Sequence, residues 1–352
     1  MASREKIAVL VSGGVDSSVA LGELVKQDRY DITAFYLKIW LEEEYQFLGD
    51  CPWEEDLAYA RAVCDRLGVA LKVVSLQSEY WDRVVSTAID ELKAGRTPSP
   101  DILCNQRVKY GAFLDYFGGE FAKVASGHYA GVKIQGDRAY LTTAKDTVKD
   151  QTYFLSFLSQ SQLQRCLFPL ADFCKAEVRE RARALDLATH ARRDSQGICF
   201  LGKIKYRDFV RAHLGSRPGA IVDRATNKVL GEHDGFWFHT IGQRKGLGLS
   251  GGPWFVVDKD IKQNIIYVAN QENLTSEARQ AFEIDNCHWI TEPPVSDLAV
   301  KIRHGEKTYR CRIERQGVAA RVHLETADPG IASGQYAVFY LANQCLGAGI
   351  IS

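Results

Sequence analysis

Short apolar runs alternate with longer amphipathic stretches over residues 7–129, and this alternation constrains the fold more than any other feature. The strand-sized runs are Ile7–Val11, Ile32–Leu37, Leu71–Leu76 and Lys123–Ser126. The helix-like stretches are Ser17–Lys26, Glu54–Leu67, Tyr80–Ala94 and Gln106–Phe117. Alternating strands and helices build βαβ units, so the pattern predicts an α/β fold with a parallel sheet between helices. Ligands are then expected at the carboxyl ends of the strands.

The rest of the chain predicts two further units. A hairpin is expected from residues 132–135 and 139–143, and a helix at Lys175–Leu185. After about Gly202, frequent glycines and short strands indicate a small mixed linker domain. From Phe282 onward, alternating runs predict a compact antiparallel β-barrel: Leu298–Ile302, Thr308–Ile313, Ala319–Leu324 and Tyr336–Tyr340. The predicted domains are therefore residues 1–202, 203–275 and 276–352.

Composition narrows the class of protein. With 46% hydrophobic and 25% charged residues, the chain has the make-up of a globular protein, and its apolar runs are too short to cross a membrane. Nine cysteines without a Cys-x-x-Cys pair argue against a disulfide framework or a cysteine-rich zinc module, and no metal site is expected. The 44 basic and 44 acidic residues cancel, so binding of a polyanion requires a local basic patch. No leader is visible.

The segment Ser12-Gly13-Gly14-Val15-Asp16-Ser17-Ser18 joins the first expected strand to the first expected helix. Two glycines let the backbone approach a phosphate, and the helix offers free N–H groups and the positive end of its dipole. Asp16 could orient this loop or help to hold magnesium. The alternative is a plain Gly-Gly turn with a serine cap. The segment is not a Walker A loop; it resembles the PP-loop of ATP pyrophosphatases, which adenylate a substrate oxygen.

Two cysteines have unusual settings. Cys104 ends a proline-rich stretch before the helix expected near Gln106, where the helix dipole and neighbouring cations would lower a thiol pKa. Asp101, three residues earlier, could act as a general acid or base. Cys199 lies in a polar loop, Arg193–Phe200. Each cysteine alone could be structural, but beside an adenylating loop the pair favours sulfur transfer, because an adenylated carbonyl needs a nucleophile.

Beyond the PP-loop, the chain resembles the tRNA-specific 2-thiouridylases nearly end to end. The matching segments are Ser12–Ser18, Glu79–Trp81, Gly95–Pro98, Pro100–Asn105, Ser126–Tyr129, Lys149–Leu155, Asp194–Phe200, His239–Gly248, Val256–Asp260 and Gly334–Tyr340. The resemblance implies a PP-loop domain of the adenine nucleotide alpha hydrolase-like type. It also implies ATP-dependent thiolation of the wobble uridine of tRNA at C2, with ATP and Mg²⁺ as cofactors.

The resemblance assigns roles residue by residue. Cys199 would carry a persulfide, Cys104 would attack it to leave a Cys104–Cys199 disulfide, and Asp101 would be the acid or base. ATP would bind Leu10, Val11, Ser12, Gly13, Gly14, Val15, Asp16, Ser17, Leu37 and Gly127. The target base would contact Ser99, Pro100 and Asp101, and other parts of the tRNA would contact His128, Lys149, Asp150, Gln151, Arg303, His304 and Gln335. The family usually has Asn at position 99, Met at 37 and another aromatic residue at 304.

The implied partners are a tRNA with a wobble uridine and a persulfide-carrying sulfur donor, with no membrane, for a monomeric enzyme. Its location would be cytoplasmic in a bacterium, or plastid or mitochondrial in a eukaryote if a transit peptide is missing. One alternative is a PP-loop ligase or amidotransferase that acts on a small molecule and needs no cysteine pair. A cluster-dependent tRNA thiolase and a non-enzymatic tRNA-binding protein are the others.

Overall fold

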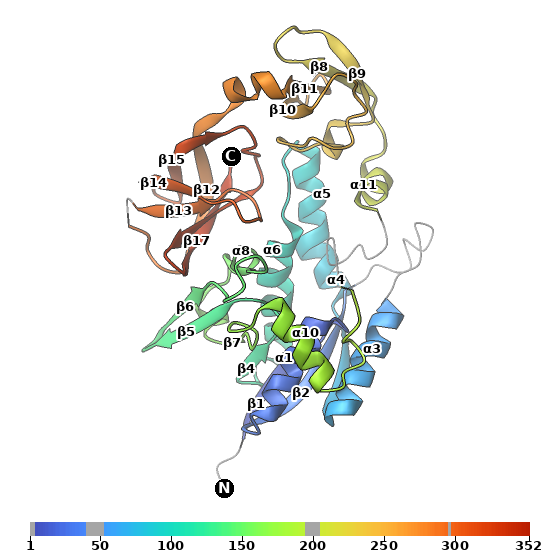
Figure 1. Ribbon diagram of the computed structural model, residues 1–352, viewed down its shortest axis with the longest axis vertical. Coiled ribbons are helices and arrows are strands. Elements are labelled where there is room, and N and C mark those ends of the chain that lie inside the picture. The colour runs from blue at the N-terminus through green and yellow to red at the C-terminus, as the bar shows by residue number, and fades with distance from the viewer. Residues whose placement is uncertain (1–3, 40–52, 194–204, 295–296) are drawn as a thin grey trace.

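The computed structural model describes residues 4–39, 53–193, 205–294 and 297–352. Its three sheets belong to three parts of the molecule: a parallel-sheet domain at the bottom of Figure 1, a small sheet at the top, and a barrel at the side. Within the described residues, no helix has the length and apolar character needed to cross a membrane.

The first sheet has the strand order β3-β2-β1-β4-β7, and all its pairings are parallel. Its strands are β1 (Glu5–Leu10), β2 (Tyr30–Lys38), β3 (Ala70–Ser75), β4 (Lys123–Ala125) and β7 (Cys166–Leu167). The predicted parallel sheet is confirmed. Strand β7 was not predicted, because two residues are too short to show a periodic pattern.

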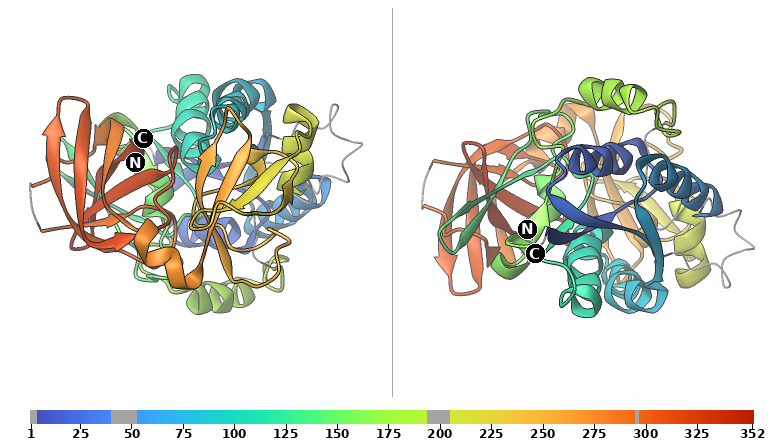
Figure 2. Two further views of the ribbon diagram at one scale, coloured as in Figure 1. Left: turned by 90° about the horizontal axis from the view of Figure 1, so that it is seen from above. Right: turned by 90° about the horizontal axis from the view of Figure 1, so that it is seen from below.

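Helices cover both faces of this sheet, as Figure 2 shows. On β1, the alternating side chains of Ile7 and Val9 pack towards one face, formed by α1 (Val15–Lys26), α3 (Trp53–Leu67) and α10 (Lys175–Ala184). Ala8 and Leu10 pack towards the other face. That face is covered by α4 (Gln77–Tyr80), η2 (Trp81–Val85), α5 (Ser86–Lys93), α6 (Pro100–Cys104), η3 (Asn105–Ala112) and α7 (Phe113–Phe117).

The helix that carries Cys104 begins earlier than predicted. The sequence placed its start near Gln106, whereas α6 begins at Pro100 and continues directly into η3. Proline is favoured in the first turn because it fixes φ and lacks the N–H that would be unsatisfied there. Cys104 is therefore not at a helix N-terminus. It is buried in the core, three residues after Asp101 and on the same helical face.

The C-terminal part is a closed barrel. Its strands are β12 (Arg279–Trp289), β13 (Leu298–Lys301), β14 (Tyr309–Gln316), β15 (Ala319–Asp328), β16 (Tyr336–Leu341) and β17 (Gln344–Ile351). Their pairings are antiparallel, and β12 closes the barrel on β17, so the predicted barrel is confirmed.

The predicted hairpin is also present, and it joins the barrel to the first domain. It consists of β5 (Gly131–Gln135) and β6 (Arg138–Thr142), and Thr142 of β6 lies opposite Gln344 of β17. The hairpin thus extends the sheet of the barrel. Between the hairpin and α10 lie α8 (Thr152–Leu155) and α9 (Gln160–Leu163).

The middle part is a small mixed sheet in the order β10-β11-β8-β9. Its elements are β8 (Gly219–Asp223), β9 (Val229–His233), β10 (Trp254–Asp260), β11 (Ile265–Asn270), the short helices η4 (Phe236–Phe238) and η5 (Gln271–Glu277), and the preceding helix α11 (Tyr206–Leu214). β8 and β11 pair in parallel, and the other two pairings are antiparallel. Ile221, Val256 and Ile266 form its core.

His239, directly after η4, is expected to make stability depend on pH. It is buried, and among the described residues neither ring nitrogen has a hydrogen-bond partner. Burial lowers the pKa of His239 to about 4, and His233 and nearby cations act in the same direction. As the pH falls below about 6.5, this histidine is therefore protonated in the unfolded chain before it is protonated in the folded protein.

Lowering the pH from 7 to 5 should thus cost about 2 kcal/mol of unfolding free energy through this group alone. We expect His239→Phe to remove that component, as measured by urea unfolding at both pH values. An unchanged difference between pH 7 and pH 5 in His239→Phe would contradict this expectation.

Candidate active site

The phosphate loop turns between the carboxyl end of β1 and the start of α1, as predicted from the sequence. The Ser12 backbone N–H donates to Ser17 Oγ at 3.1 Å. The hydroxyls of Ser17 and Ser18 donate to the Gly14 carbonyl at 3.1 and 2.8 Å. The hydroxyls of Ser17 and Ser18 therefore shape the loop in this structure. The free backbone N–H groups at the start of α1 remain the means of binding an anion.

Gly13 and Gly127 make room for this loop. Gly13 has φ +74°, and a Cβ there would meet the Asp56 carbonyl of α3. Gly127 follows β4, the neighbour of β1, and a Cβ on it would lie 2.6 Å from Ser17 N and 2.7 Å from Asp16 C. Leu37 stands at the end of β2, the other neighbour of β1. The structure thus brings the residues expected to bind ATP to one edge of the sheet.

Gly127→Ala is expected to weaken ATP binding at least about tenfold, or ~1.4 kcal/mol, because the added methyl group must displace the first turn of α1. Isothermal titration calorimetry with ATP measures this change. Gly119→Ala is the matched control, since a Cβ at Gly119 meets nothing within 4 Å. Equal ATP affinity in the two variants would contradict the expected contact between residue 127 and the loop.

Asp16 is held by two residues from distant parts of the chain. Lys175, the first residue of α10, donates to Asp16 Oδ1 at 2.7 Å and Oδ2 at 2.9 Å. The Tyr129 hydroxyl donates to Oδ1 at 2.8 Å. The side chains of Lys175 and Asp16 are 16% and 33% exposed, so the pair is only partly screened by water. Lys175 therefore offsets the one negative charge that the phosphate loop carries.

Arg192 contacts the same loop and α3. It donates to the Gly13 carbonyl at 2.7 Å and pairs with Asp56 of α3. Its guanidinium group also stacks over the Tyr59 ring at 4.5 Å. Arg192 thus ties the phosphate loop to α3 at the point where Gly13 packs against Asp56.

Of the two cysteines predicted to transfer sulfur, the described residues include only Cys104. Cys104 is 1% exposed at the end of α6, within the core that includes Tyr153 and Leu155. Cys199 lies outside the described residues, so their predicted disulfide stays a prediction. Ser99 immediately precedes α6, and Pro100 and Asp101 form its first turn. The expected base-binding residues and Cys104 therefore share one short helix.

Several residues expected to touch tRNA have inward contacts. Asp150 is buried and accepts from the Ala144 N–H at 3.1 Å and the Thr152 hydroxyl at 2.6 Å. Gln151 accepts from the Tyr129 N–H at 3.0 Å. Lys149 is partly exposed beside them. In this tripeptide Asp150 is buried, whereas Lys149 and Gln151 are both partly exposed.

His128 is also buried. Its Nδ1 lies 2.6 Å from Ser126 Oγ, which lies 2.7 Å from the Tyr110 hydroxyl. Burial and the charge of Lys109 hold the pKa of His128 well below its ordinary value, so the ring is neutral at pH 7. His128 follows the carboxyl end of β4, and its burial favours a role in shaping the site.

The barrel residues lie closer to the site than their place in the sequence suggests. The His304 ring stacks on Phe154 with centroids 4.4 Å apart. Partial burial lowers the pKa of His304, while the carboxylates of Asp150 and Asp101 act in the opposite direction. His304 therefore lies near Asp101 of α6. Arg303 donates to Asp328 at 2.8 Å.

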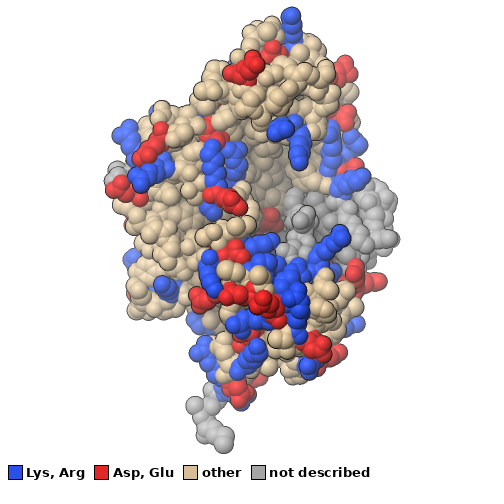
Figure 3. Space-filling model, viewed as in Figure 1, with Lys and Arg blue, Asp and Glu red and all other residues tan. Residues whose placement is uncertain are grey.

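A hollow opens above the carboxyl edge of the parallel sheet. Figure 3 shows it in the middle of the face seen in Figure 1, between the three parts of the molecule, with Lys and Arg side chains and some Asp and Glu side chains around it. Because the chain has no net charge, these Lys and Arg side chains are the local positive charge that the hollow offers to a polyanion.

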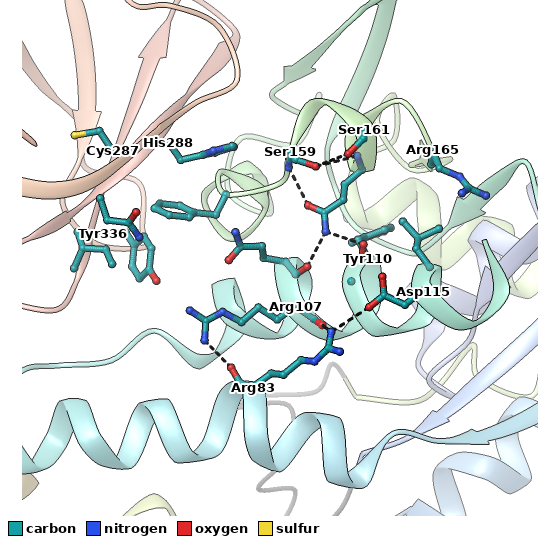
Figure 4. A pocket seen from close by; sticks show the side chains of 17 residues that line it. Arg83, Arg107, Tyr110, Asp115, Ser159, Ser161, Arg165, Cys287, His288 and Tyr336 are labelled. Carbon is teal, nitrogen blue, oxygen red and sulfur yellow. Dashed lines mark hydrogen bonds and ion pairs between the residues drawn. The ribbon is translucent and has the colours of Figure 1, made fainter. Parts of the chain in front are cut away.

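A separate pocket of about 710 Å³ lies between η3 and the barrel (Figure 4). None of the predicted site residues lines it. Arg83 and Arg107 donate to each other's backbone carbonyl oxygens at 3.1 and 2.9 Å, and Arg165 donates to the Gly118 carbonyl at 2.7 Å. These arginines brace helices and turns, so the pocket is not the candidate active site.

Among the described residues, no group of His, Cys, Asp or Glu side chains could hold a metal ion.

Neither Lys175 nor Arg192 was predicted to contact the phosphate loop. Lys175 lies 159 residues from Asp16, and Arg192 lies 179 residues from Gly13. Lys175 is the first residue of a predicted helix, where an ordinary solvated lysine would look the same. Only the packing of α10 against α1 reveals the pair.

Family models match three successive parts of the chain. They are the tRNA methyl transferase HUP domain over residues 5–203, the tRNA methyl transferase PRC-barrel domain over 207–270, and the aminomethyltransferase beta-barrel domain over 279–351.

Curated relatives match over the full length. The tRNA-specific 2-thiouridylase MnmA of Parabacteroides distasonis is 47% identical over 98% of each chain. MnmA 1 of Bacteroides thetaiotaomicron is 46% identical, over 98% of this chain and 99% of its own. Among solved structures, the U34-tRNA thiolase NcsA from Methanococcus maripaludis with its [4Fe-4S] cluster is 15% identical. It has a TM-score of 0.36 over 60% of this chain and 65% of its own, a likeness too remote to bear on function.

Proposed function

Because the chain belongs to the MnmA family of tRNA-specific 2-thiouridylases, we propose that it adenylates the C2 carbonyl of a wobble uridine with ATP and replaces that oxygen with sulfur. At this level of identity and coverage, the chain shares the activity of the family, which is ATP-dependent transfer of sulfur to tRNA. The single observation that carries the finer proposal is that Leu10, at the carboxyl end of β1 before the phosphate loop, and Cys104 of α6 belong to the same buried core.

ATP would lie with its phosphates on the loop from Leu10 to Ser17 and its adenine near Leu37. The support is geometric: because Gly13 and Gly127 lack a Cβ, the phosphate loop can pack closely against α3 and against residue 127 after β4. Magnesium would arrive as part of the nucleotide, since both Asp16 oxygens already accept from Lys175. The uridine O2 attacks the α-phosphorus, and pyrophosphate leaves.

Sulfur transfer would follow through the cysteines. The Cys104 thiolate attacks Sγ of a Cys199 persulfide, forming a Cys104–Cys199 disulfide and expelling the terminal sulfur as hydrosulfide. Hydrosulfide attacks C2, and AMP leaves with the former carbonyl oxygen. The sulfane sulfur is reduced by two electrons that the two thiols supply, so a thiol reductant must reset the enzyme. Asp101 is placed one helical turn from Cys104 to move a proton.

The tRNA would occupy the hollow, with the wobble base turned out of its stack towards Ser99, Pro100 and Asp101. Phosphates would contact Lys149 and Arg303, and Gln151, His304 and Gln335 would complete the tRNA-binding surface. The buried His128 and Asp150 would support that surface from beneath. We propose the domains 1–202, 203–275 and 276–352 for catalysis, linkage and tRNA binding, in a monomer that receives sulfur from a persulfide-carrying protein. The bacterial relatives favour a cytoplasmic enzyme.

Mass spectrometry of tRNA nucleosides tests the proposal. The protein is incubated with ATP, magnesium, a persulfide donor and unmodified tRNA, and wild type is compared with Cys199→Ser. We expect 2-thiouridine with wild type only. Cleavage of ATP without 2-thiouridine would instead favour a PP-loop ligase acting on a small molecule.

A further inference from the structure

Residues 94–99 connect α5 to α6, and the four residues Gly95–Pro98 within this connection lead directly into Ser99, Pro100 and Asp101. Within the parallel-sheet domain, the side chain of Arg96 holds this connection to the helix that precedes it. Arg96 forms a bidentate pair with Glu91, with both N···O distances 2.6 Å, which ties it to the end of α5. The rest of the connection is held by the other two parts of the molecule.

The barrel contacts this connection through the turn Ser333-Gly334-Gln335. The Thr97 N–H donates to the Ser333 carbonyl at 2.8 Å. Gln335 Nε2 donates back to the carbonyls of Thr97 and Pro98 at 3.1 and 3.3 Å. Gly334 lies between these bonds, and a Cβ on it would be 2.8 Å from Thr97 N and 2.9 Å from Thr97 O. The barrel thus meets the connection backbone to backbone, a contact that only glycine at this position permits.

The middle part holds the same connection from another side. The hydroxyls of Thr97 and Thr240 are 3.2 Å apart. Gly95 has φ +77°, and a Cβ on it would overlap the side chain of Ile261, which follows β10. Both C-terminal parts therefore converge on a segment of four residues that ends where α6 begins.

We propose that Gly334 and Thr240 are positioning residues: they hold Gly95–Pro98 so that α6 presents the target-base pocket and Cys104 in register with the phosphate loop. The inference rests on the proposed function. Neither residue touches the reacting atoms, so their loss lowers the rate of thiolation more than it weakens binding of tRNA or ATP.

The experiment compares Gly334→Ala with Gly317→Ala. Gly317 lies in an exposed barrel turn with φ +67°, close to the +85° of Gly334, but a Cβ there meets nothing within 4 Å. Both variants carry a similar backbone strain, and only Gly334→Ala pushes on Thr97. Single-turnover thiolation at saturating tRNA and ATP is measured beside the tRNA dissociation constant and the melting temperature.

We expect Gly334→Ala to thiolate at least about tenfold more slowly than Gly317→Ala, with tRNA affinity within about threefold. Thr240→Val should slow thiolation, and Thr240→Ser, which keeps the hydroxyl, should recover it. Equal rates for the two glycine variants, or a loss explained by tRNA affinity alone, would overturn the inference. If wild type itself makes no 2-thiouridine, the proposed function fails instead.

Discussion

Cys104→Ala is expected to lower the formation of 2-thiouridine at least about a thousandfold while single-turnover release of pyrophosphate continues. The variant lacks the thiolate that would attack the Cys199 persulfide, but the phosphate loop, which precedes α1, is unchanged. Nucleoside mass spectrometry measures the thiolated product, and a coupled pyrophosphate assay measures adenylation. The two readouts separate loss of sulfur transfer from loss of nucleotide chemistry.

The matched control for this experiment is Cys64→Ala. Cys64 and Cys104 are each 1% exposed and each lie on a helix of the parallel-sheet domain, so truncation leaves a similar cavity in the two variants. We expect Cys64→Ala to retain thiolation. Normal 2-thiouridine formation by Cys104→Ala would exclude Cys104 as the second thiol and leave it as a core residue.

Lys175→Met is expected to slow the cleavage of ATP to AMP and pyrophosphate by about 100-fold to 1000-fold. The change removes a cation from the phosphate loop and leaves the Asp16 carboxylate, now uncompensated, where the nucleotide must place its own negative charge. Single-turnover assays with labelled ATP and unmodified tRNA measure the rate. Lys175→Arg, which keeps the charge with another geometry, should retain part of the activity.

Lys145→Met provides the control within the same region. Lys145 pairs with Glu177 of α10 at 2.9 Å, but both side chains are about half exposed, and such pairs contribute little. We expect the Lys145→Met variant to cleave ATP at the wild-type rate. Recovery of full activity in the double variant Asp16→Asn, Lys175→Met would show that Lys175 only neutralises Asp16. In that case Lys175 does not act on the phosphates.

Most of the fold was predictable from the sequence, because the burial pattern of a strand repeats every two residues and that of a helix every 3.6. Such patterns involve only residues that are close together along the chain. Four strands of the parallel sheet, β1 to β4, were predicted close to their observed bounds, as were α1, α3, α10 and the hairpin. The start of α6 was misplaced, because a proline-rich segment resembles a loop until Pro100 is seen to occupy the first turn. Within the candidate site, the phosphate loop was identifiable because its glycines and serines are consecutive.

The sequence by itself determined the parallel α/β domain, the phosphate loop and the barrel, since each follows from residues that are neighbours along the chain. Only the tertiary structure decided that Lys175 faces Asp16, that β6 extends the barrel through β17, and that Gly334 packs on Thr97. The physical reason is the same in each case. These contacts join surfaces whose approach depends on how whole elements pack, and a lysine, an edge strand or a turn glycine has the same local pattern with or without its partner.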